Sequence, residues 1–310
     1  MNRQEFLKGL AAAGTVVAVS SFGEMDVLAQ TKKKKAGKPD LVAVMGGEPA
    51  EMFAAAMKAI GGIGRFVKKG QKVTIKPNIG WDKAPELAAN TNPDLLTALI
   101  RACFDAGAAE VTVFDHTCQG WQDCYRSSGI EAAAKAAGAK VVPGNDERYY
   151  RETELPKGVK LRSAKIHQAI LDCDVWFNVP ILKTHGGARM TIAMKNLMGI
   201  VWDRQMFHRT DLQQCIADIC TLSNPPVLNI VDAYRVMTAN GPQGRGLGDV
   251  AKPKGLFLST DIVAVDTAAT SFFNQIKKMS IDEVGHIGLG EKLRLGTTDL
   301  KKLKVERIKL

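Results

Sequence analysis

The sequence predicts an α/β protein built on a mostly parallel sheet with helices on both faces. Its 310 residues, 45% of them hydrophobic, are enough to bury a large core. Beyond residue 39, short apolar segments alternate with segments of helical spacing, which is typical of repeated β-α-β units. Polar side chains directly follow several of the apolar segments. Together these observations favour a Rossmann-like layered sheet in a single domain over residues 40–310.

The first half of this domain is expected to alternate strand and helix without interruption. Asn92-Pro93-Asp94 is its clearest helix start, because Asn is a good N-cap residue and Pro fits the first helical position. Gly107 stops that helix. The expected strands are residues 40–45, 72–75, 110–114 and 140–142, and the other expected helices are residues 51–60 and 127–137.

The second half continues the pattern after a polar, proline-bearing stretch at residues 144–165, which we expect to form a small excursion from the sheet. Asp261 is the expected N-cap of the last long helix. The final segment KVERIKL, residues 304–310, is expected to be an edge strand. The remaining expected elements are a short helix at 165–171, strands at 175–179, 227–231 and 255–258, and helices at 211–222 and 261–273.

Residues 1–29 have the three parts of a cleavable export signal. A basic start precedes the apolar run Gly9 to Phe22, and the segment closes on small residues up to Ala29. The run is too short to span a membrane, so no stable span is expected after cleavage. The segment after Arg3 resembles a twin-arginine signal in which Gln4 replaces the second arginine. We expect an exported protein, periplasmic or at the cell surface.

The charge and the cysteines exclude several classes of protein. The formal net charge is +10, and Lys32 to Lys35 lie in a short linker, residues 30–39. The other cations are spread without the patterns of nucleic-acid-binding modules, so nucleic acid is not an expected partner. None of the six cysteines forms a C-x-x-C pair, so an iron–sulfur cluster held by this chain alone is not expected. Cys118 and Cys124 fit either a disulfide or two reduced thiols.

Polar residues gather just after the expected strands. Lys76 and Asn78 follow one strand, Asp115 follows the next, and Asp232 follows a later one. The segment Lys183-Thr184-His185 follows residues 175–179 in the same way. Because the carboxyl ends of parallel strands share one edge of a sheet, we expect these side chains to meet in one crevice. Ammonium groups brought together there repel each other by about 1 to 4 kcal/mol, which an anion relieves.

Eight ordered motifs add a family resemblance. They are KPNIGW, TNPDLLTALI, FNVPILKTH, MKNLMG, MFHRTDLQQCIAD, LNIVDAY, NGPQG and STDIVAVDTAA. From about Lys72 to Gly290 this order resembles the bacterial and archaeal family called domain of unknown function 362. The resemblance implies an α/β protein that often carries an export signal, and some members are joined to ferredoxin-like modules. The positions that match family motif residues are Lys76, Asn78, Lys183, Thr184, His185, Lys195, Asn196, His208, Asp232 and Asp266.

The first functional hypothesis is an exported enzyme that acts on a small anionic substrate, a phosphate or a carboxylate. Lys183 would be a base or imine-forming nucleophile, or it would hold the anion with Lys76. His185 or His208 would transfer a proton, and Asp115 and Asp232 would orient that histidine or hold a divalent cation. The expected substrate-binding residues are Lys76, Asn78, Thr184, Lys195 and Asn196.

The alternatives are a redox or iron–sulfur-associated accessory protein with a redox partner, and an anion-binding protein without turnover. The sequence leaves the cofactor open, including a divalent metal.

Overall fold

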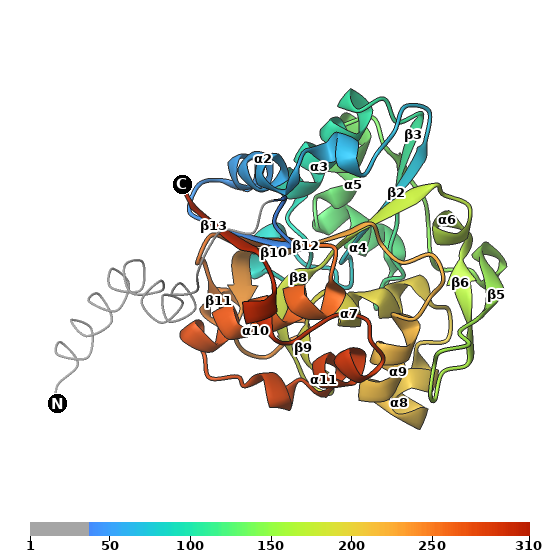
Figure 1. Cartoon of the computed structure of the whole chain (residues 1–310). Helices are drawn as coiled ribbons and strands as arrows, with labels where there is room; N and C mark the ends of the chain where they lie inside the picture. Colours follow the sequence, from blue (N-terminus) through green and yellow to red (C-terminus); the bar gives the residue numbers. More distant parts are fainter. Residues whose placement is uncertain (1–36) are drawn as a thin grey trace. The chain divides into compact units, whose positions relative to one another are not determined.

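The predicted α/β architecture with a mostly parallel sheet is confirmed by the computed structural model, which describes residues 37–310 (Figure 1). Residues 38–310 form one compact unit. The predicted signal at residues 1–29, and the linker up to residue 36, lie outside the described residues. Among residues 37–310, no helix combines the length and the apolar character needed to cross a membrane.

Within the described residues, eleven strands form one sheet. Along its main path, every neighbouring pair is parallel except the two pairs that involve β12. The path runs in space through β13 (Val305–Lys309), β1 (Leu41–Met45), β12 (Gly255–Ser259), β10 (Leu228–Met237), β7 (Val175–Val179), β2 (Lys72–Pro77), β3 (Glu110–Val113) and β4 (Lys140–Val141). Three more strands extend the sheet away from this path. Of these, β8 (Ile181–His185) and β11 (Val250–Ala251) pair with β10, and β9 (Arg189–Thr191) pairs with β8.

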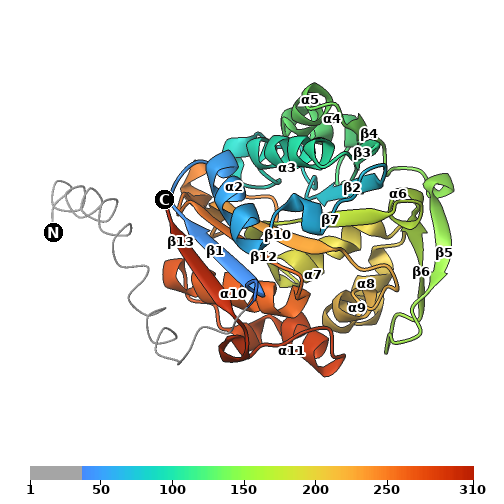
Figure 2. The same ribbon diagram turned by 45° about the horizontal axis from the view of Figure 1, so that its top comes forward.

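Helices cover both faces of this sheet (Figure 2). The strands are therefore apolar on both sides: Leu41 and Ala43 of β1 join one hydrophobic cluster, while Val42 and Val44 join the other. One face carries α2 (Pro49–Ile60), α3 (Pro93–Asp105), α4 (Trp121–Ser127) and α5 (Ile130–Ala136); the other carries α7 (Ala193–Asn196), α8 (Gln205–Thr210), α9 (Leu212–Ile219), α10 (Ile262–Ile276) and α11 (Gly285–Lys292).

The predicted helix starts are confirmed at the two longest helices. The side chain of Asn92 accepts a hydrogen bond from the backbone N–H of Asp94, and Pro93 is the first residue of α3. Asp261 accepts from the N–H of Ala264 at the start of α10. Each side chain satisfies a backbone donor that the helix itself leaves unpaired.

Two predicted helices are wrong in part. Only residues Gln168–Leu171 of the expected helix 165–171 are helical, as α6, because the residues before them pair with a neighbouring strand. The expected helix 127–137 is divided at Gly129, whose φ of 71° ends one helix and precedes the next. Part of the segment between Cys118 and Cys124 forms the start of α4.

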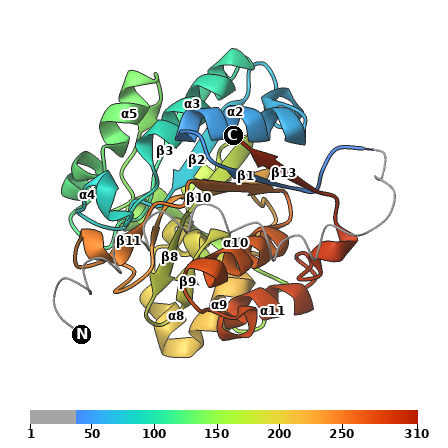
Figure 3. The same ribbon diagram turned by 90° about the vertical axis from the view of Figure 1, so that its left-hand side faces the viewer.

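Two strand predictions also change, and both changes affect the site. Lys183, Thr184 and His185, expected as polar residues beyond the end of a strand, instead belong to the further strand β8 (Ile181–His185), which pairs with β9 and β10. The strand expected to end at residue 231 continues to Met237 as β10. Figure 3 shows β8 and β9 between β10 and the helices α9 and α11.

Residues 150–167 leave the main sheet. They form a separate antiparallel pair, β5 (Tyr150–Glu154) and β6 (Ser163–His167), in the part of the chain expected as an excursion (Figure 1). The hairpin lies at the side of the unit and contributes a wall to a pocket described below.

All six cysteines are unpaired in the structure. Cys118 is exposed and Cys124 is buried at the inner face of α4. Of the two states that the sequence allowed for this pair, the structure therefore has the two free thiols.

Candidate functional site

A buried ion pair lies where β2 and β3 end. The Nζ atom of Lys76 is 2.7 Å from Oδ1 of Asp115, and both side chains are almost fully buried. Lys76 donates its other hydrogen bonds to the carbonyl oxygen of Pro77 at 2.8 Å and to Oδ1 of Asn196 at 3.0 Å. Burial lowers the pKa of Lys76, and the neighbouring Asp115 opposes that shift. All three donors of this ammonium are thus used within the protein.

Asn196 of α7 is the centre of the buried network. Its Oδ1 accepts from Lys76 and from Nδ2 of Asn78 at 2.9 Å, while its Nδ2 donates to Oδ1 of Asn178 at 2.8 Å. Asn178 in turn donates to Asn229 at 2.9 Å. Lys76, Asn178 and Asn229 are register partners on β2, β7 and β10, so they form one polar row across the sheet. A buried network with its partners satisfied is rigid.

Lys183 joins the same network from β8. Its Nζ donates to Oδ1 of Asn78 at 3.0 Å and to the carbonyl oxygen of Ala89, and the side chain is about 1% exposed. Burial, followed by the charges of nearby groups that include Lys195 and Lys76, lowers the pKa of Lys183 to about 7. Residues more than a hundred positions apart therefore converge here, as the sequence predicted. We call Lys76, Asn78, Asp115, Asn178, Lys183 and Asn196 the buried lysine network.

Gly199 lies directly against the ion pair. A Cβ atom at this position would be 2.0 Å from Oδ1 of Asp115 and 2.6 Å from Nζ of Lys76. Gly241 lies equally close to β8, since a Cβ atom added there would be 1.9 Å from the carbonyl oxygen of Thr184. The backbone N–H of Gly241 donates to Oγ1 of Thr184 at 3.2 Å. These two glycines, from the motifs MKNLMG and NGPQG, allow close approach of the backbone.

Lys195, one residue before Asn196, lies at the edge of the network and is only half-buried. Among the described residues its ammonium has no hydrogen-bond or ion-pair partner. The pKa of Lys195 is lowered to about 8: burial is the largest cause, the charges of Arg204 and Lys76 act in the same direction, and Cys118 and Asp115 oppose them. We call Lys183, Lys195 and Arg204 the cation cluster.

The short helix α7 is held in place by Asp266 of α10. The carboxylate accepts from the backbone N–H groups of Ala193 at 2.7 Å and Met194 at 3.0 Å, the first residues of α7. Burial raises the pKa of Asp266 to about 7, and these two hydrogen bonds oppose that shift. Asp266 therefore orients the helix that carries both Lys195 and Asn196.

Two predicted histidines lie near the cation cluster. His185 is half-buried at the end of β8, and its Nδ1 accepts from the N–H of Ala188 at 3.1 Å. Burial, then the charges of Lys195 and Lys183, hold the pKa of His185 far below its usual range, so this ring is neutral at pH 7. His208, on α8, is exposed; partial desolvation of its ring, then the charges of Lys195 and Arg204, lower its pKa.

Asp232 does not join the cluster. It lies within β10 and not beyond its end, and its carboxylate accepts from the backbone N–H groups of Asn92 at 2.8 Å and Tyr234 at 3.0 Å. Burial raises the pKa of Asp232 to about 6. The structure gives this residue a role in anchoring the start of α3, because β10 is longer than the sequence suggested.

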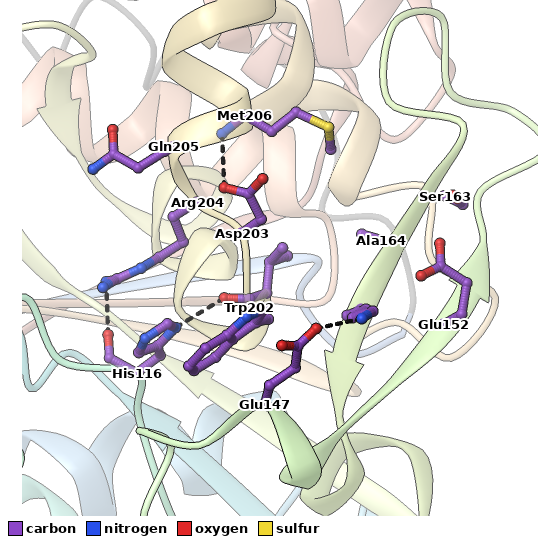
Figure 4. Close-up of a pocket in the computed structure, with 12 residues that line it drawn as sticks. His116, Glu147, Glu152, Ser163, Ala164, Trp202, Asp203, Arg204, Gln205 and Met206 are labelled. Carbon is purple, nitrogen blue, oxygen red and sulfur yellow. Dashed lines mark hydrogen bonds and ion pairs between the residues drawn. The ribbon is translucent and has the colours of Figure 1, made fainter.

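A pocket of about 550 Å³ opens beside the cation cluster, between the β5–β6 hairpin and residues 201–206 (Figure 4). The ring of His116 stacks on Trp202 with the centroids 5.2 Å apart. Arg204 donates to the carbonyl oxygens of His116 and Thr117, each at 2.7 Å. The same guanidinium approaches Sγ of Cys118 at 3.4 Å. Arg204 thus belongs both to the pocket wall and to the cation cluster.

Sequence reasoning missed Arg204, Cys118 and Asn178. Asn178 is a polar residue inside the otherwise apolar strand VWFNV. Because polar residues are seldom buried without a hydrogen-bonding role, its position in the sequence could have indicated a site residue. Cys118 follows β3 by a few residues, in the position that drew attention to Asp115. Arg204 follows no strand, and only the folded chain brings it to the site.

The residues of the buried lysine network fall within a stretch that matches a known family model. Residues 73–271, more than half of the chain, match the model described as Domain of unknown function (DUF362). This chain belongs to that family. The DUF362 stretch includes the cation cluster and ends inside α10, so α11 lies beyond it.

A curated relative is a thylakoid-associated protein of Synechocystis sp. It is 24% identical over 221 residues, which are 69% of this chain and 66% of that protein. The match therefore covers slightly less than two thirds of the relative's length.

Two solved structures show distant similarity. The lactate racemase apoprotein of Thermoanaerobacterium thermosaccharolyticum has a TM-score of 0.48 and 11% identity, covering 79% of this chain and 60% of that one. A Thermotoga maritima protein has a TM-score of 0.42 and 11% identity, covering 79% and 58%. Likeness at this level says nothing about chemistry. Within residues 37–310, no three His, Cys, Asp or Glu side chains are grouped as a metal site requires.

Proposed function

We propose that this DUF362 protein is an enzyme that binds a small anion, phosphate or carboxylate, at the cation cluster. The observation that supports this most is Lys195, a half-buried ammonium with no hydrogen-bond or ion-pair partner among the described residues, within electrostatic range of Lys183 and Arg204. Charges of one sign at short range are unfavourable, and a bound anion removes that repulsion. Folds of this kind bind ligands at the carboxyl ends of parallel strands, and the neighbouring Lys76 and Asp115 lie where β2 and β3 end, which supports the proposal.

The chemistry that this arrangement supports best is proton transfer at the bound anion. The pKa of Lys195 is lowered to about 8 and that of Lys183 to about 7, so both amines exchange protons near neutral pH. As an ammonium, Lys195 holds the anion; as an amine, it accepts a proton. The buried lysine network keeps the surrounding groups fixed during these steps. An anion-binding protein without turnover would use the same geometry, and only an activity assay separates the two.

A panel of anions tests the proposal. Thermal unfolding of the wild type is measured with inorganic phosphate, sulfate, and phosphorylated and carboxylated metabolites, and then repeated with Lys195→Met. Lys135→Met is the matched control, because Lys135 on α5 is exposed and pairs with Glu131 of the same helix. We expect at least one anion to stabilise the wild type and the control but not Lys195→Met. Equal shifts in all three proteins would rule out this site.

Export remains part of the proposal. It depends on residues 1–29 alone, and fractionation of expressing cells tests it. A mature protein that begins near residue 30 in the exported fraction supports it, while a full-length protein confined to the cytoplasm contradicts it.

A further inference from the structure

His286 of α11 carries a buried hydrogen-bonding atom that no group among residues 37–310 satisfies. The side chain is completely buried, and within the described residues its Nε2 atom has no hydrogen-bond partner. Leaving such an atom unpaired costs about 1 to 3 kcal/mol, so each case in a folded protein calls for an explanation.

The protonation state of this ring is fixed by Gln213. Oε1 of Gln213 accepts from the backbone N–H of His286 at 2.9 Å, and a backbone N–H can only donate, so this atom is the amide oxygen. Nδ1 of His286 lies 2.7 Å from the same oxygen and must therefore carry a proton. Burial, then the charge of Lys195, lowers the pKa of His286 to about 3, which keeps the ring neutral. Nε2 is thus a bare acceptor.

The helix α11, which carries His286, packs against the helix α7, which carries Lys195. Gly290, one turn later on the same face of α11, is so close to α7 that a Cβ there would be 2.6 Å from Cε of Met194. Met194 directly precedes Lys195. In addition to burial, the charge of Lys195 lowers the pKa of both His286 and His185, so the three side chains lie within electrostatic range of one another. The unpaired acceptor is therefore on a helix that packs against α7, within electrostatic range of Lys195.

We propose that the anion bound at the cation cluster also carries a hydroxyl group, which donates a hydrogen bond to Nε2 of His286. This inference rests on the proposed function and narrows its substrate class to small hydroxylated phosphates or carboxylates. A charged amino group would also be a donor, but Lys183, Lys195 and Arg204 would repel it. Since the side chain of His286 is completely buried, the hydroxyl reaches Nε2 only when neighbouring side chains move on binding.

Matched ligand pairs test the proposal. Titration calorimetry compares glycolate with acetate, and glycerol 1-phosphate with propyl phosphate, on the wild-type protein; glycine is the aminated analogue of glycolate. We expect the hydroxylated member of at least one pair to bind tenfold or more tightly than its partner, and glycine not to bind. In His286→Leu the preference should fall below threefold, while the hydroxyl-free anion keeps its affinity within twofold. His286→Gln, which retains an acceptor, should recover part of the preference.

The outcomes separate this inference from the proposed function. Equal affinity within every pair on the wild type would mean that His286 is met by a trapped water only, and would overturn the inference while leaving anion binding intact. Absence of binding by every anion would overturn both. Binding that is lost in Lys195→Met but shows no hydroxyl preference would support the proposed function alone.

Discussion

Lys76 shows how a charge is kept inside this protein. Its ammonium has an ion-pair partner, a carbonyl oxygen and an amide oxygen, which together use its three donors. Burying a charge is tolerated only when the partners are this complete. The consequence is that Lys76 has nothing left to offer a ligand. Its expected role in holding a substrate passes, in our proposal, to the half-buried Lys195.

Breaking this pair should be costly on either side. Lys76→Met or Asp115→Asn alone is expected to destabilise the fold by about 3 to 5 kcal/mol, because each leaves a buried partner uncompensated. The double substitution should be less destabilising than the sum by about 1 to 3 kcal/mol. Urea denaturation of the four proteins measures the coupling. Strictly additive effects would mean that the two groups do not depend on each other.

Gly199 should tolerate no side chain. In Gly199→Ala the new Cβ would meet Asp115 and Lys76 at 2.0 and 2.6 Å, so one of them must move. We expect a loss of about 1 to 3 kcal/mol, typical of overpacking, together with a weaker anion-induced thermal shift. The control is Gly64→Ala, where a Cβ meets nothing within 4 Å. That variant should stay within about 0.5 kcal/mol of the wild type. A similar effect at both glycines would contradict the packing argument.

For single residues, the sequence predicted where the side chains lie better than it predicted what each side chain does. The rule that polar residues after parallel strands converge correctly brought Lys76, Asp115 and Lys183 together. This rule could not distinguish Lys195 from Asn196, because the two residues are adjacent in the sequence. The helical turn of α7 directs Asn196 into the buried lysine network and leaves Lys195 at its edge. Asp232 lies apart from the cation cluster for a different reason. Pairing with β12 and β8 extends β10 past residue 231, so Asp232 lies within the strand and not beyond its end.

Among the elements, β8 and α7 decide the site. Both are short and neither was predicted from the sequence, because five polar and apolar residues or a single helical turn carry no clear periodicity. Their placement comes from tertiary contacts: β8 pairs with β9 and β10, and α7 is fixed by the carboxylate of Asp266. The long helices α3 and α10, with their own caps, could be predicted.

The placement of Lys183 on the buried strand β8 predicts a pH dependence. Its pKa is about 7 in the folded protein, below the ordinary value of 10.5, so the unfolded chain binds more protons between these values. Stability from this group therefore rises with pH across that window, by up to about 1.4 kcal/mol per pH unit. Denaturation at pH 7.5 and 8.5 should show a larger stability gain for the wild type than for Lys183→Met. An identical gain in both proteins would contradict the lowered pKa.

For the whole molecule, the layered fold follows from strands that are apolar on both faces and alternate with helices. This could be predicted because it depends on local patterns repeated along the chain. The one antiparallel strand in the main path, β12, could not be predicted, since strand direction is decided by how the chain returns across the sheet. Family membership agrees with the ordered motifs and covers the same segments.

The most direct test of anion binding at the cation cluster is an anomalous difference map from crystals soaked in selenate, a tetrahedral oxyanion. We expect a selenium peak at the edge of the buried lysine network, with selenate oxygens within hydrogen-bonding distance of Nζ of Lys195, and its absence from Lys195→Met crystals. Peaks only at exposed surface lysines, or an equal peak in the variant, would contradict the central claim.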